Sequence, residues 1–230
     1  MLLRRCGAEF FGTFCLVFAG TGAIVINDTA GSAITHVGIA LTFGLIVLVM
    51  IYTLGDISGA HLNPAVTVGF FAAGRLRFGD VLPYISSQLA GALAASALLR
   101  SLFPGHATLG ATLPSGPLLQ SFVLEVVLTL ILMLVILSVS TGAKEKGITA
   151  GIAVGSMIAL EALFAGPISG ASMNPARSLG PALMSGRMDS LWLYFAAPLL
   201  GALLAVPACF CLRGRSCCFV PASPIAPAHD

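Results

Sequence analysis

The chain has 230 residues, of which 57% are hydrophobic and only 9% are charged, and its formal net charge is +2. Soluble domains carry about 25% charged residues, so this composition excludes a water-soluble globule and predicts a protein whose solvent is the lipid bilayer. The small net charge, without a basic run or a basic patch interleaved with aromatic residues, excludes a nucleic-acid-binding protein.

Six stretches are apolar over roughly the 20 residues that a helix needs to cross a bilayer. They lie at about 7–26, 36–54, 82–102, 118–140, 148–166 and 190–212. Two shorter apolar segments, 64–73 and 175–184, follow the second and the fifth stretch and are too short to span. Each opens with proline after an asparagine, which is typical of a helix N-terminus. We therefore predict two half-helices that begin inside the membrane, where irregular backbone must line a cavity or be buried in protein.

Basic residues indicate how the spans are oriented. With six spans, four basic pairs fall on one side of the membrane: Arg4 and Arg5, Arg75 and Arg77, Lys144 and Lys146, Arg213 and Arg215. Because cytoplasmic loops carry the excess of Lys and Arg, we expect both termini in the cytoplasm and an integral protein of the plasma (inner) membrane. The tail 213–230 is rich in proline and has no apolar period, so we expect it to be a disordered cytoplasmic segment.

The two halves of the chain, about 7–102 and 118–212, repeat one another within a single predicted channel domain, 1–212. Residues 57–65 read Ile-Ser-Gly-Ala-His-Leu-Asn-Pro-Ala, and residues 168–176 read Ile-Ser-Gly-Ala-Ser-Met-Asn-Pro-Ala. Each half has three spans, so the second half must lie inverted relative to the first. Inverted repeats place a binding site near the midplane, between broken helices. The pattern predicts an all-α membrane protein with a pore between the half-helices.

The polar residues of these segments suggest how such a pore would work. Asn63 and Asn174 are expected to meet at its centre, where their amides can donate to a passing water while the positive half-helix ends repel cations. Arg177 is too costly to bury unpaired and is expected to face the wet pore. Glu9 and Glu125, in matching spans of the two halves, are expected to accept the unpaired N–H groups of the loops before the half-helices.

Two Asn-Pro-Ala motifs in inverted halves, with Arg177 directly after the second, resemble the major intrinsic protein (aquaporin) family over residues 7–212. The string 170–182 is most similar to the plant nodulin-26-like branch and its bacterial relatives. The resemblance implies the aquaporin fold, with six transmembrane helices and two re-entrant half-helices. It also implies a homotetramer in membrane lipid, with one pore per subunit, that passively conducts water and small uncharged solutes without a cofactor or metal.

The resemblance assigns roles to individual residues. The pore motifs are Asn63, Pro64, Ala65, Asn174, Pro175 and Ala176. The narrowest point, or selectivity filter, is expected at Phe43, Ala162, Ala171 and Arg177. Pore-facing carbonyls are expected from Gly59, Ala60, His61, Gly170 and Ser172, in loops braced by Glu9 and Glu125.

The range of solutes stays open at this point. Ala162 stands where water-selective members have histidine, which favours a wider filter that passes glycerol-like molecules or neutral metalloid acids. Ser178 and Ala182 stand where glycerol facilitators have aspartate and lysine, which favours the alternative of a strictly water-selective channel. More remote alternatives are a secondary transporter, which needs coupling-ion ligands at the midplane, and a non-conducting structural membrane protein. The sequence shows no nucleophile–base pair, metal cluster or phosphate loop, so it does not predict an enzyme.

Overall fold

The protein was analysed as a computed structural model that describes residues 1–140 and 144–214, the side chains of 144–148 excepted. The described residues form eight helices and no strand. The helices are α1 (Leu2–Thr29), α2 (Thr35–Ser58), α3 (Pro64–Ala72), α4 (Phe78–Leu102), α5 (Leu118–Val139), α6 (Lys144–Ser169), α7 (Pro175–Ser185) and α8 (Leu193–Arg213). The prediction of an all-α membrane fold is confirmed, since six of these helices are long and apolar enough to cross a membrane. The predicted disordered tail lies, from residue 215 on, outside the described residues.

Several helices are longer than their apolar stretches. Helix α1 begins at Leu2 and α6 at Lys144, about one turn before the predicted starts at 7 and 148. Both extensions carry basic residues that a hydropathy pattern places outside the bilayer, although backbone hydrogen bonding continues through them. Hydropathy therefore predicts where the spans lie, whereas the helix ends are set by where backbone hydrogen bonding stops.

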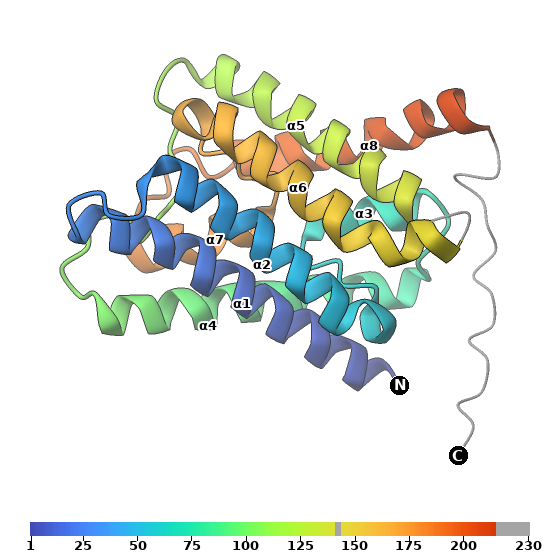
Figure 1. Ribbon diagram of the computed structural model, residues 1–230, viewed down its shortest axis with the longest axis horizontal. Coiled ribbons are helices and arrows are strands. Elements are labelled where there is room, and N and C mark those ends of the chain that lie inside the picture. Colours follow the sequence, from blue (N-terminus) through green and yellow to red (C-terminus); the bar gives the residue numbers. More distant parts are fainter. Residues whose placement is uncertain (141–143, 215–230) are drawn as a thin grey trace.

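The long helices run side by side along the molecule, and the two short helices extend from its middle towards opposite ends (Figure 1). Helix α1 packs against α4 and α2, while α5 packs against α8 and α6, and α2 meets α6 between the two groups. The N-terminus and the end of α8 lie at the same end of the bundle (Figure 1). Each half thus contributes three long helices and one short helix, and α3 and α7 approach each other in the middle.

Glycines set how closely the long helices approach. A Cβ atom at Gly91 of α4 would collide with the backbone carbonyl of Phe10 in α1, and one at Gly201 of α8 with that of Val126 in α5. These two crossings occupy matching places in the two halves. Because lipid supplies no hydrophobic drive for helix association, such small residues let the backbones pack by direct contact.

Replacing Gly155 of α6 by leucine should reduce the amount of folded protein. A Cβ atom there would lie 2.6 Å from the carbonyl oxygen of Gly44 in α2 and 2.7 Å from Leu48 Cβ, so the two helices must separate. Overpacking of this kind costs about 1–3 kcal/mol. Detergent-solubilised yield and melting temperature measure the effect. Gly7→Leu is the control, because a Cβ atom at that helical glycine meets nothing within 4 Å; equal stability of both variants would contradict the tight crossing.

Candidate functional site

The two half-helices meet through their capping asparagines. The Asn63 Oδ1 atom accepts from the Ala65 amide at 2.8 Å, and the Asn174 Oδ1 atom accepts from the Ala176 amide at 3.0 Å. Each side-chain NH₂ group then donates to the other half of the chain: Asn63 to the Met173 carbonyl at 2.7 Å, and Asn174 to the Leu62 carbonyl at 2.9 Å. An amide NH₂ group carries two hydrogens, so each asparagine keeps one donor for the cavity that both residues line.

The loops that lead into the half-helices have the same unusual backbone in both halves. Ala60 and Leu62 have φ values of 47° and 52°, and Ala171 and Met173 have values of 41° and 52°. This left-handed conformation is unfavourable for residues with a Cβ atom and costs about 1–3 kcal/mol each, so the surroundings must hold it in place. Alternating conformations also direct N–H groups and carbonyls to different sides of the loop.

Glu9 holds the first of these loops. Its side chain is fully buried. One carboxylate oxygen accepts from the Ser58 hydroxyl at 2.6 Å and the His61 amide at 2.9 Å, and the other accepts from the Leu62 amide at 2.8 Å and from Gln88 Nε2 at 2.7 Å. Hydrogen bonds from several donors to one carboxylate are strong because the acceptor is charged.

Glu125 holds the second loop with a matching set of contacts. This side chain is also fully buried. It accepts from the Ser169 hydroxyl at 2.8 Å, the Ser172 amide at 2.8 Å and the Met173 amide at 2.7 Å. The structure thus brings Glu9 and Glu125 to the backs of the two loops, whose opposite sides face the cavities.

Two tyrosines hold the same loops and were missed in the sequence. The Tyr84 hydroxyl donates to the Ser58 carbonyl at 2.8 Å, and the Tyr194 hydroxyl donates to the Ser169 carbonyl at 2.6 Å. Both side chains are fully buried. A signal was present, because Tyr84 and Tyr194 each stand seven positions before the glycine of the third span of their half (Gly91 and Gly201; 91 − 84 = 201 − 194).

The site itself consists of two cavities. The first, which we call the inner cavity, has a volume of about 110 Å³ and is bounded by both capping asparagines and by Gly59, Ala60, His61 and Ser172. The second, which we call the outer cavity, has a volume of about 230 Å³ and includes Gly170 in its wall. Among the described residues the two cavities share four: Phe43, Ala162, Ala171 and Arg177. These are the four positions expected to form the filter. The remaining motif residues, Pro64, Ala65, Pro175 and Ala176, are buried in the first turns of the half-helices.

Arg177 is held where the two cavities meet. Only 3% of the residue is exposed. Its Nη1 atom donates to the Gly110 carbonyl at 2.8 Å, and its guanidinium lies 4.9 Å from the centre of the Phe43 ring. Gly110 belongs to the outer loop (residues 103–117), which connects α4 to α5. Sequence patterns did not point to this partner, since a backbone carbonyl has no residue signature.

Glu161 precedes Ala162 in α6 and differs from the other two buried acids. Its side chain is fully buried, yet neither carboxylate oxygen has a hydrogen-bond partner among the described residues. Glu161 therefore makes no bracing contact of the kind that Glu9 and Glu125 make.

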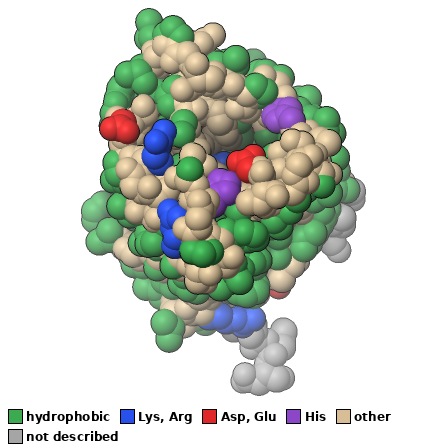
Figure 2. Space-filling model, turned by 90° about the vertical axis from the view of Figure 1, so that its left-hand side faces the viewer, with side chains coloured by type: hydrophobic (Ala, Val, Ile, Leu, Met, Phe, Trp, Pro, Cys, Tyr) green, Lys and Arg blue, Asp and Glu red, His purple; other side chains and the backbone are tan. Residues whose placement is uncertain are grey.

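The end of the molecule away from the termini is hollowed near its middle (Figure 2). Charged and histidine side chains lie around this hollow, while hydrophobic side chains cover much of the flanks (Figure 2). A polar, hollowed end between apolar flanks suits a chain that lies in lipid and opens to water at its ends.

Comparisons with known proteins agree with this architecture. Residues 1–208 match the sequence profile of the family described as major intrinsic protein. The chain is 49% identical over 201 residues to aquaporin NIP1-1 of Zea mays, covering 87% of this chain and 71% of that protein. It is 45% identical over 202 residues to nodulin-26 of Glycine max, covering 87% and 74%. The X-ray structure of the aquaglyceroporin from Plasmodium falciparum superposes with a TM-score of 0.81 at 28% identity, covering 89% of this chain and 94% of that one.

Proposed function

Since the chain belongs to the major intrinsic protein family and is a channel for water and small neutral solutes rather than an enzyme, we propose that Phe43, Ala162, Ala171 and Arg177 form its selectivity filter. The observation that carries this proposal is that these four residues alone, within the described chain, border both cavities. A solute that passes from the outer cavity to the inner one must cross the ring they form.

The chemistry of this ring suits an uncharged molecule with both apolar and hydroxyl surface. Phe43 and Ala162 provide an apolar wall, and Arg177 provides fixed donors on another side. Glycerol can place its carbons on the first and its hydroxyl groups on the second, and a neutral metalloid acid can direct its hydroxyl groups to the second. Cations meet the Arg177 charge and then two half-helix N-termini, each equivalent to about half a positive charge.

The asparagines at the centre are proposed to break the proton wire. Each keeps one amide hydrogen for the inner cavity after bonding to the opposite loop. A water that accepts from both asparagines must point its own hydrogens away in both directions, so it cannot relay a proton through the centre. The carbonyls of the loops held by Glu9 and Glu125 supply acceptors along the path.

The alternative of a strictly water-selective channel depended on Ser178 and Ala182. Both residues are buried, and neither is among the residues that line the two cavities. The Ser178 hydroxyl instead accepts from Thr112 Oγ1 at 2.8 Å and lies 2.5 Å from Ser172 Oγ. These two positions support the packing behind the filter, so they carry little weight against solute passage.

We further propose that residues 1–212 form one channel domain of two inverted repeats, about 7–102 and 118–212. The matching contacts of Glu9 and Glu125, and of Tyr84 and Tyr194, support this repeat. The basic residues Arg4, Arg75 and Arg213 support placing both termini in the cytoplasm, in the plasma (inner) membrane. The homotetramer with one pore per subunit is proposed from the family.

Conduction should be passive, because no aspartate or glutamate of the described chain lines either cavity, where its carboxylate could bind a coupling ion. Purified protein in liposomes, measured by stopped-flow light scattering with water, glycerol and boric acid, should carry each solute down its own gradient. Imposing a proton gradient should not change these rates, and protein-free liposomes give the background. Uphill accumulation of a solute driven by protons would establish a transporter instead.

A further inference from the structure

The position of the Arg177 guanidinium depends on the outer loop. Its contact with the Gly110 carbonyl, at 2.8 Å, is made to a residue in a left-handed conformation, with φ 72°. Leu109 before it also has a left-handed φ of 51° and is fully buried against Val25 and Leu99. A non-glycine residue in this conformation persists only where surrounding contacts hold it. Something must therefore fix the turn that presents the carbonyl.

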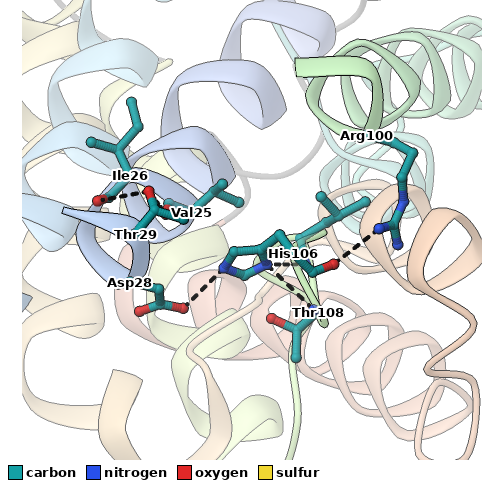
Figure 3. A network of polar contacts seen from close by, with 8 residues as sticks. Val25, Ile26, Asp28, Thr29, Arg100, His106 and Thr108 are labelled. Atoms are coloured by element: carbon teal, nitrogen blue, oxygen red, sulfur yellow. Dashed lines mark hydrogen bonds and ion pairs between the residues drawn. The ribbon is translucent and has the colours of Figure 1, made fainter. Parts of the chain in front are cut away.

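His106 supplies that contact. Its Nδ1 atom accepts from the Leu109 amide at 2.9 Å and from the Thr108 amide at 3.3 Å. Because both amides are donors, Nδ1 must be unprotonated and the ring proton sits on Nε2, which points to the Asp28 carboxylate at 3.3 Å. Figure 3 shows the imidazole between Asp28 at the end of α1 and the Thr108 backbone.

Arg100 fastens the same loop to the half-helix that carries Arg177. Its Nη1 atom donates to the His106 and Pro104 carbonyls, both at 3.0 Å. Its Nη2 and Nε atoms donate to the carbonyl of Met184, in the last turn of α7, at 2.8 and 3.1 Å. The guanidinium of Arg100 thus reaches the loop backbone at His106 (Figure 3) and ties it to α7.

We propose that His106 is a positioning residue of the selectivity filter, which acts through the Thr108–Leu109 turn to hold the Gly110 carbonyl against Arg177. The inference rests on the proposed filter. If the turn relaxes, the Arg177 guanidinium loses its buried acceptor and turns towards water in the channel, since an unpaired buried cation is costly. The opening then narrows, so passage of a bulky solute falls more than passage of water.

A matched pair of variants separates this role from general loop stability. In His106→Asn the side-chain oxygen can take the place of Nδ1 and accept from the two amides. In His106→Gln the polar group is one bond further out and takes the place of Nε2, so the turn loses its acceptor. We expect the ratio of glycerol to water permeability to fall by about threefold or more in His106→Gln, and to stay near the wild-type value in His106→Asn.

Arg177→Val and the double variant Arg177→Val/His106→Gln complete the test. If His106 acts through Arg177, the effect of His106→Gln on the ratio disappears in the Arg177→Val background. If Arg177→Val changes the ratio and His106→Gln does not, the filter stands and the inference about His106 is wrong. If Arg177→Val leaves the ratio unchanged, the proposed filter itself is wrong and the inference fails with it.

Discussion

Ala162→His should sharply reduce glycerol permeation while water permeability stays within a few-fold of the wild type. Ala162 is one of the four residues that border both cavities. An imidazole there fills part of the opening that position 162 shares with Arg177, and it adds a second polar group to the wall. Water can still pass between two polar walls, whereas a three-carbon solute loses both its space and its apolar surface.

Stopped-flow measurements of the permeability to water, glycerol and boric acid in the wild type and in Ala162→His test this prediction. Ala162→Ser is the matched control: it adds a polar group with little volume and should retain most of the glycerol permeation. The wide-filter proposal would be falsified if the wild type already excluded glycerol, urea and neutral metalloid acids, since the protein would then be a strictly water-selective channel.

Glu9→Gln and Glu125→Gln should each lower the amount of folded channel far more than they change its selectivity. Each substitution puts an NH₂ group, which is a donor, in place of one acceptor oxygen, so that two donors face each other in the loop. For Glu125 the affected amides are those of Ser172 and Met173, 2.8 and 2.7 Å from the carboxylate. Leaving buried donors without an acceptor costs about 1–3 kcal/mol each, in loops whose backbone is already unfavourable.

Glu161→Gln is the control for these two variants, because it makes the same change in another fully buried acid. Neither oxygen of Glu161 has a hydrogen-bond partner among the described residues, so this change breaks no hydrogen bond and should leave stability near the wild-type value. Yield, melting temperature and water permeability per molecule should be measured for all three variants. Normal yield and normal permeability in Glu9→Gln and Glu125→Gln would refute the bracing role.

Much of this fold could be predicted because the bilayer imposes simple rules on a chain. A span needs an apolar stretch of fixed length, and a short stretch opened by Asn-Pro must begin inside the membrane. The duplicated motif then gave the arrangement of the halves. The tyrosines Tyr84 and Tyr194 were missed although the repeat contained them, because a single hydroxyl in an apolar helix has many uses other than holding a loop.

The outer loop could not be predicted for a different reason. Residues 103–117 have no apolar period, and their contacts are made mainly by the backbone, such as the Gly110 carbonyl on Arg177. Any residue type offers a carbonyl, so composition does not mark the position. The roles of His106 and Arg100 depend on tertiary placement as well, since their partners lie on α1 and α7.

The hydrogen bonds that the two asparagines donate to the opposite loops also bear on the order in which the nascent chain becomes structured. Asn63 donates to the Met173 carbonyl, 110 residues further along the chain. At the usual 5–20 residues per second of protein synthesis, that acceptor leaves the ribosome on the order of 5–20 seconds after Asn63. Until then the first half-helix has no partner at its tip. The long helices can insert as they emerge, whereas the two pore loops can only be completed together, after the second Asn-Pro-Ala motif has been made.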